Sequence, residues 1–155
     1  MKTVHQWLAE YSISHRNPTN NTLHWICVPQ IVFAAFLAFK CIALGHGLAN
    51  AELLVMALSL AYYLRLSWRL AIGLALVYVP MYYATVLIQQ AAGPYTLAIA
   101  AAIFVVAWIG QFIGHHYEGA KPSFFKDLQF LLIGPLWLMS FIYRKLQIPM
   151  SPVRS

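Results

Sequence analysis

The chain has 155 residues, of which 61% are hydrophobic and 9% charged, and its formal net charge is +6 at pH 7. Soluble globular domains carry about 25% charged residues, and a domain with so few charges could not cover a water-exposed surface with them. Disordered chains are poor in apolar residues, so the composition excludes that class too. It predicts an integral membrane protein in which residues 1–155 form a single domain.

The amino-terminal residues predict a short surface helix followed by the first membrane span. Residues 3–14 place apolar side chains at i, i+3, i+4 and i+7, the spacing of an amphipathic helix, which we expect to lie at the membrane surface. The apolar residues at this spacing are Val4, Trp7, Leu8 and Tyr11. A polar segment follows, in which Asn20, Asn21 or Thr22 would cap a helix that begins near residue 23.

Further apolar runs predict four transmembrane helices, over residues 23–44, 48–64, 70–89 and 95–114. The final apolar stretch, residues 128–143, is shorter than the about 20 residues that a crossing needs, and Gly134 and Pro135 interrupt it. We therefore expect a re-entrant or interfacial hairpin there. The predicted fold is an all-α polytopic membrane helix bundle of four transmembrane helices, an amino-terminal amphipathic helix and a carboxy-terminal hairpin.

The basic residues give this bundle an orientation and offer no surface for nucleic acid. They flank the apolar runs instead of forming a cluster, and such residues mark the cytoplasmic side of membrane proteins. With a cytoplasmic amino terminus and a carboxy-terminal hairpin, nine of the ten lie on the cytoplasmic side, and Lys40 is the exception. The expected location is the inner membrane of a bacterium, or the endoplasmic reticulum if the source is eukaryotic.

Three histidines fall at the cytoplasmic ends of the predicted spans. His15 precedes the first span, His24 lies in its first turn, and His115 follows the fourth. Ionisable groups at membrane depth are costly and point to function, and the positive end of a helix favours the neutral imidazole at His24 that a metal needs. We predict a metal site of His15, His24 and His115. His116 is about 100° away from His115 on a helix, so both could bind one ion only if the helix ended there.

Amides and a carboxylate surround these histidines in the sequence. Such groups can hold an imidazole N–H and so fix the tautomer that binds metal. The candidate catalytic residues are Asn17, Asn20 and Glu118. Glu118 could act as a metal ligand, a general base or an orienting partner, or it could form a helix-terminal salt bridge to Lys121.

Two motifs resemble the small polytopic 2-hydroxy fatty acid dioxygenase family, which is best known from a yeast endoplasmic-reticulum enzyme. They are Tyr11-x3-His15-x-Asn17-Pro18-x-Asn20-x3-His24-x4-Pro29 and Gln111-Phe112-x-Gly114-His115-x2-Glu118-Gly119-x2-Pro122. The resemblance implies iron(II)-dependent alpha-oxidation, in which molecular oxygen is used to shorten a 2-hydroxy fatty acid by one carbon. It also implies that His15, His24 and His115 are the Fe(2+) ligands. The fungal pattern has one more residue between its second-motif histidine and glutamate and has no second histidine, which leaves the roles of His116 and Glu118 open.

Membrane lipid would surround such an enzyme, and its acyl substrate would need apolar surroundings. Aromatic residues that could supply them, or could equally pack in the core or face lipid, are Phe33, Phe36, Tyr82, Tyr83, Phe104 and Trp108.

Three other functions are alternatives to a 2-hydroxy fatty acid dioxygenase. Diiron membrane hydroxylases need more histidines than the six present. A haem-binding membrane protein with His24 and His115 as axial ligands, and a non-enzymatic membrane protein for transport or assembly, stay open.

Overall fold

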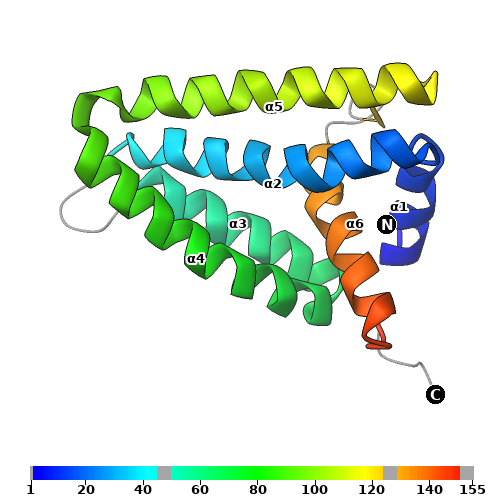
Figure 1. The fold of residues 1–155 in the computed structure, drawn as a ribbon. Helices are drawn as coiled ribbons and strands as arrows, with labels where there is room; N and C mark the ends of the chain where they lie inside the picture. Colours follow the sequence, from blue (N-terminus) through cyan, green and yellow to red (C-terminus); the bar gives the residue numbers. More distant parts are fainter. Residues whose placement is uncertain (1, 45–49, 124–128, 151–155) are drawn as a thin grey trace.

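The computed structural model describes residues 2–44, 50–123 and 129–150, and this part of the chain is all-helical, as predicted, apart from one isolated bridge between Ala43 and Asn50. Figure 1 shows the helices as a long upper pair, a second pair below it, and two shorter helices at one end. In chain order they are α1 (Val4–Ser12), α2 (Pro18–Lys40), α3 (Ala51–Leu66), α4 (Trp68–Ala92), the 3-10 turn η1 (Gly93–Tyr95), α5 (Thr96–Glu118) and α6 (Phe130–Lys145).

The upper pair is α2 and α5, which lie side by side along their length (Figure 1). Two glycines four residues apart on α5 let the backbones approach, as small-residue pairs do in membrane helices. A Cβ atom at Gly110 would lie 2.5 Å from Cys27 Sγ, and one at Gly114 would lie 2.5 Å from Asn20 Oδ1. This packing brings the carboxyl end of α5 against the amino end of α2, where the candidate metal ligands lie.

The lower pair, α3 and α4, is joined at Ser67, whose side chain accepts a hydrogen bond from the Leu70 N–H at 3.2 Å and so caps α4. Both helices pack on α2, and α6 packs on α1, α2 and α4. The largest apolar side chains that are less than 2% exposed come from four of these helices. They are Leu37, Tyr63, Leu70, Ile133, Leu136 and Trp137.

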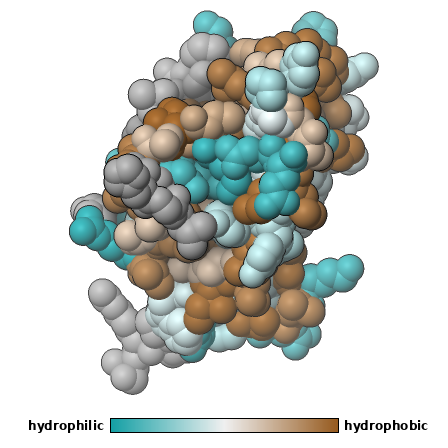
Figure 2. Space-filling view, turned by 90° about the vertical axis from the view of Figure 1, so that its left-hand side faces the viewer, coloured by the Kyte–Doolittle hydropathy of each residue, from teal (hydrophilic) through white to brown (hydrophobic). Residues whose placement is uncertain are grey.

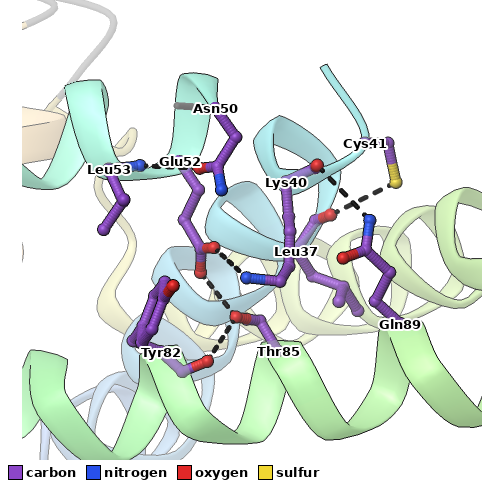
Figure 3. A network of polar contacts seen from close by, with 9 residues as sticks. All are labelled: Leu37, Lys40, Cys41, Asn50, Glu52, Leu53, Tyr82, Thr85 and Gln89. Atoms are coloured by element: carbon purple, nitrogen blue, oxygen red, sulfur yellow. Dashed lines mark hydrogen bonds and ion pairs between the residues drawn. The ribbon is translucent and has the colours of Figure 1, made fainter. Parts of the chain in front are cut away.

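A buried ion pair fastens α2, α3 and α4 at the end of the bundle far from the histidines (Figure 3). Lys40 Nζ lies 2.7 Å from Glu52 Oε2, with both side chains almost fully buried. Thr85 Oγ1 donates to Glu52 Oε1 at 2.6 Å, and the Lys40 ammonium lies 4.4 Å from the Tyr82 ring centre. In a space-filling view of this end, Figure 2 shows a hydrophilic patch within a largely hydrophobic surface.

Two stretches of the described chain, and not four, are long and apolar enough to cross a membrane. They are Pro18–Lys40 and Trp68–Glu118, and the second contains α4 and α5 joined at Gly93. The predicted second span corresponds to α3, which has only 16 residues. Only 33% and 22% of the residues in the most apolar windows of the two stretches are buried inside the molecule, and exposed apolar residues such as Leu76 and Val106 lie in the second stretch.

The predicted amino-terminal helix is present as α1, and its apolar face packs on α6: the ring centres of Trp7 and Phe130 lie 5.2 Å apart, and those of Tyr11 and Trp137 lie 5.3 Å apart. One other prediction of local structure is wrong. The predicted carboxy-terminal hairpin is a single helix, because α6 continues through Gly134 and Pro135 and buries the segment that contains them. Tertiary packing outweighs the helix-breaking tendency of the Gly-Pro pair.

Candidate metal centre

The turn between α1 and α2 carries His15, and Asn17 determines where α2 begins. The Asn17 side-chain oxygen accepts hydrogen bonds from the N–H groups of Thr19 and Asn20 at 2.9 and 3.4 Å, so Asn17 is the N-cap in place of the residues predicted. Because α2 begins at Pro18, His24 lies in its second turn and not in the first. The helix dipole acts mainly within the first turn, so it is not what keeps His24 neutral.

Backbone carbonyls fix the tautomers of two histidines. His15 Nδ1 lies 2.5 Å from the Tyr11 carbonyl oxygen, and His24 Nδ1 lies 2.9 Å from that of Asn20. A carbonyl can only accept a hydrogen bond, so each Nδ1 carries the proton and each Nε2 holds a lone pair. The two Nε2 atoms lie 2.9 Å apart. Two lone pairs facing each other at this distance repel, and a cation bound to both removes that repulsion.

His115 completes the cluster from the last turn of α5. Its ring centre lies 4.9 Å from that of His15 and 5.0 Å from that of His24. Its Nδ1 is buried and has no hydrogen-bond partner within the part of the chain that the structure describes. The helix continues through His116 to Glu118, so the two neighbouring histidines point in different directions, and His116 is exposed. This geometry brings His115 to the cluster and turns His116 away.

The histidine cluster is buried, and His15, which lies between α1 and α2, is neutral. His15, His24 and His115 are 4%, 1% and 5% exposed, and the Tyr11 ring stacks on His15 with centres 4.0 Å apart. Burial, followed by the nearby His24, lowers the pKa of His15 to about 3. A neutral imidazole is the form that ligates a metal ion. Burial also keeps Tyr11 protonated, because it raises the pKa of the phenol well above its ordinary value.

These donors fit a transition-metal ion. One nitrogen from each of the three histidines lies within 4.8 Å of the others. Two nitrogens about 2.1 Å from one ion and at right angles to each other are about 3 Å apart, which agrees with the 2.9 Å between His15 and His24. Imidazole nitrogens suit iron, zinc, copper and nickel alike. The geometry therefore supports a metal ion without choosing its identity.

The predicted candidates Glu118, Asn17 and Asn20 meet in a network that we call the clamp. Glu118 Oε1 accepts from the Arg16 N–H at 2.9 Å, and Oε2 accepts from the Asn17 N–H at 2.7 Å. Asn20 Nδ2 donates to Glu118 Oε2 and to the Ser14 carbonyl, at 3.1 Å each. The clamp ties the turn that carries His15 to the helix that carries His115. Both carboxylate oxygens of Glu118 already accept hydrogen bonds, and no salt bridge joins it to Lys121 in the described structure.

A pocket opens beside His24 and His115, between α2, α5 and α6. Its polar wall includes Gln111 and Ser123, and its apolar wall comes mainly from α2 and α6. Of the six aromatic residues considered from the sequence, only Trp108 lines it. Phe36 packs in the core against Tyr78 with ring centres 4.8 Å apart, and Tyr83 and Phe104 are exposed.

Sequence reasoning gave Tyr11 no role beside the histidines and gave Gly110 and Gly114 no role in helix packing, although both leave a signal. Tyr11 stands four residues before His15, the spacing of neighbours on one helix face. The Gly110-x3-Gly114 pair lies in an apolar run, where such a pair marks a helix-packing face. The Ser14–Ser123 hydroxyl pair, at 2.6 Å, joins residues 109 apart and has no comparable local signal.

Comparison with known proteins identifies the family of this chain. A sequence profile described as Mpo1-like, 2-hydroxy-palmitic acid dioxygenase Mpo1-like, matches residues 1–146. The "2-hydroxy-palmitic acid dioxygenase MPO1" of Saccharomyces cerevisiae is 27% identical over 135 residues, which is 85% of this chain and 75% of the yeast protein. No solved structure matches. The chain therefore belongs to the Mpo1-like family of 2-hydroxy-palmitic acid dioxygenases.

Proposed function

We propose that this protein is a non-haem iron(II) dioxygenase that performs alpha-oxidation of 2-hydroxy fatty acids, shortening them by one carbon with molecular oxygen. Family membership and the name of the yeast relative support the substrate class. The observation that carries the proposal is the 2.9 Å approach of two Nε2 atoms whose Nδ1 atoms both face backbone carbonyls. An arrangement that places two lone pairs face to face is suited to a bound cation.

In this proposal His15, His24 and His115 hold the iron. The bound Fe(2+) would supply Lewis-acid and redox chemistry toward molecular oxygen. The carbonyls of Tyr11 and Asn20 hold two imidazoles in the ligating tautomer, and the rings of Tyr11 and Trp137 exclude water from one side of His15.

Glu118, Asn17 and Asn20 have positioning roles in this proposal. Their hydrogen bonds go to one another and to the backbone of the turn that carries His15. Such outer partners hold ligands in place and raise metal affinity. They act on the reaction through the histidines without touching the substrate.

The substrate would lie in the pocket beside the histidines. Its head group would meet the polar end, which contains His24, His115 and Gln111. Its acyl chain would follow the apolar wall, which consists of Val28, Ile31, Val32, Phe130 and Leu131. A wall of this kind binds an alkyl chain by removing its surface from water.

We further propose that residues 1–155 form a single polytopic membrane domain with the metal site on the cytoplasmic side. The outward-facing apolar side chains support it: Leu76 is 70% exposed and Val106 is 65% exposed, a surface that water would disfavour. Both α4 and α5 exceed the about 20 residues that a crossing needs. Basic residues flank helix ends on the histidine side, as Arg16 does before α2 and as Arg65 and Arg69 do at the junction of α3 and α4, and they support the orientation.

The proposal is tested with protein purified without oxygen or chelators. We expect about one iron per chain, no Soret band, oxygen uptake with 2-hydroxypalmitate, and a product one carbon shorter by mass spectrometry. The variant His115→Ala should lose iron, whereas the matched control His116→Ala should keep it, because His116 points away from the cluster. The proposal fails if iron-loaded protein consumes no oxygen with any 2-hydroxy fatty acid, or if the protein carries zinc that persists when each of the three histidines is replaced.

A further inference from the structure

Gln111 is a buried amide in the wall of the pocket, outside the clamp, and its side chain interacts with His24 of the histidine cluster. It lies on α5 one turn before His115, and its side chain is 5% exposed. Its Nε2 has no hydrogen-bond partner within the described residues. It lines the pocket together with His24 and His115. The unpartnered donor therefore belongs to a side chain that lines the same pocket as two of the candidate metal ligands.

A buried donor without a partner is unfavourable, and native proteins retain few of them. The surroundings offer this amide little. The pocket wall contains two hydroxyl-bearing residues, Tyr11 and Ser123, and the Ser123 hydroxyl is engaged with Ser14 at 2.6 Å. The wall formed by α2 and α6 is mostly apolar. The partner that the donor lacks is supplied most simply by a ligand that places an oxygen next to the histidines.

We propose that Gln111 recognises the polar head of the ligand, donating a hydrogen bond from Nε2 to an oxygen of a 2-hydroxy carboxylate. This inference rests on the proposed function, because it takes the substrate class from it. A site built to pair a polar group discriminates strongly against analogues that lack it. Gln111 would thus favour 2-hydroxy acids over unsubstituted acids of equal length, while the apolar wall accepts either chain.

The test measures ligand binding in the absence of turnover. Iron-loaded protein is kept under argon, and the dissociation constants of 2-hydroxypalmitate and palmitate are determined by calorimetry. In Gln111→Leu we expect binding of 2-hydroxypalmitate to weaken at least 10-fold, with iron content unchanged. The preference for 2-hydroxypalmitate over palmitate should shrink. Gln111→Asn, which keeps the amide but retracts it by one methylene, should give an intermediate loss.

A matched control is Gln89→Leu, because Gln89 is a partly buried glutamine on α4 that contacts the Lys40 carbonyl at 3.5 Å, far from the pocket. It should bind both acids as the parent protein does. The unfolding temperature separates recognition from structural support. Replacing an unpartnered amide by an apolar side chain should leave the ligand-free protein at least as stable, while the rise in unfolding temperature on adding 2-hydroxypalmitate should be lost.

The outcomes that would overturn the inference are distinct from those that would overturn the proposed function. Unchanged affinity and preference in Gln111→Leu overturn the role of Gln111 and leave the proposed function intact. Loss of iron, or a lower unfolding temperature of the ligand-free variant, assigns Gln111 a structural role and also overturns it. If the parent protein binds no 2-hydroxy acid, the proposed function and the inference fall together.

Discussion

Two buried polar clusters lie at opposite ends of the bundle, and they differ in how their atoms are satisfied. At the Lys40 end, the ammonium, the carboxylate of Glu52 and the hydroxyl of Thr85 pair with one another (Figure 3). At the histidine end, Nδ1 of His115, Oδ1 of Asn20 and Nε2 of Gln111 have no partner among the described residues. One cluster is complete without a ligand and the other is not.

The difference predicts that the Lys40 cluster stabilises the fold and that the histidine cluster binds a ligand. A fully paired polar network stabilises and orients the helices that contribute to it. A network with orphaned atoms is held in place at a cost in stability, and such sites are typical of function. The two clusters therefore predict opposite consequences of mutation: loss of stability at one end and loss of ligand at the other.

The largest effect is expected at the histidine end. His24→Ala should reduce iron from about one per chain to a trace, because it removes one of three ligands. Activity should fall by more than about 100-fold, the upper range seen when even an outer partner of a ligand is lost. Metal analysis and oxygen uptake check both. Iron retained in His24→Ala would mean that this residue is not a ligand.

Next in size is the effect of breaking the buried ion pair at the other end. Glu52→Leu leaves Lys40 charged and unpaired, and we expect the free energy of unfolding to fall by about 3–5 kcal/mol with iron still bound. The matched control is Glu10→Leu, because the side chains in the ion pair of Glu10 with Lys2 are 38% and 45% exposed, and a surface pair is worth at most about 1 kcal/mol. Equal losses in the two variants, measured in the same detergent, would contradict the comparison.

A smaller effect, on stability and metal affinity together, is expected at the contact between α2 and α5. A methyl group at Gly114 would lie 2.5 Å from Asn20 Oδ1 and 3.3 Å from its Cα, so α5 must move away. We expect Gly114→Ala to lower stability by about 1–3 kcal/mol and to weaken iron binding. In Gly110→Ala only the Cys27 side chain is in the way, and it can rotate. A larger loss of iron affinity there than in Gly114→Ala would refute this account.

The smallest effect concerns the clamp. Glu118→Gln keeps the shape of the side chain but removes its charge, so its bonds to the Arg16 and Asn17 N–H groups weaken. We expect iron affinity to fall about 10-fold with little change in unfolding temperature, and Glu118→Asp to restore part of it. Competition with a chelator measures the affinity. A complete loss of iron would indicate that Glu118 is itself a ligand.

The sequence predicts the helices well because their apolar runs are long, and the convergence of His15, His24 and His115 follows from placing those runs in one bundle. That these histidines bind iron stays a prediction. The prediction of a hairpin was wrong because the residues that pack around Gly134 and Pro135 decide whether they break a helix. A Cβ at Gly134 would lie 3.2 Å from the Tyr11 hydroxyl, and a contact so distant along the chain leaves no local pattern.

The roles of individual polar residues were harder to predict from the sequence, for the same reason. Glu118 was open to four interpretations in the sequence, and what narrows them is its contact with backbone N–H groups more than 100 residues away. Gln111 stood out only as one amide among several. Its distinguishing property is the missing partner, which a sequence does not record.

The metal ligands lie far apart along the chain, since His15 and His115 enclose a loop of about 100 residues. An ion bound by both would cross-link the turn between α1 and α2 to the end of α5, much as a disulfide closes a long loop. The ligand set assembles only after α5 has docked on α2. Metal uptake would therefore report that the bundle has finished assembling, and an excess of the ion during synthesis would favour the completed fold over its precursors.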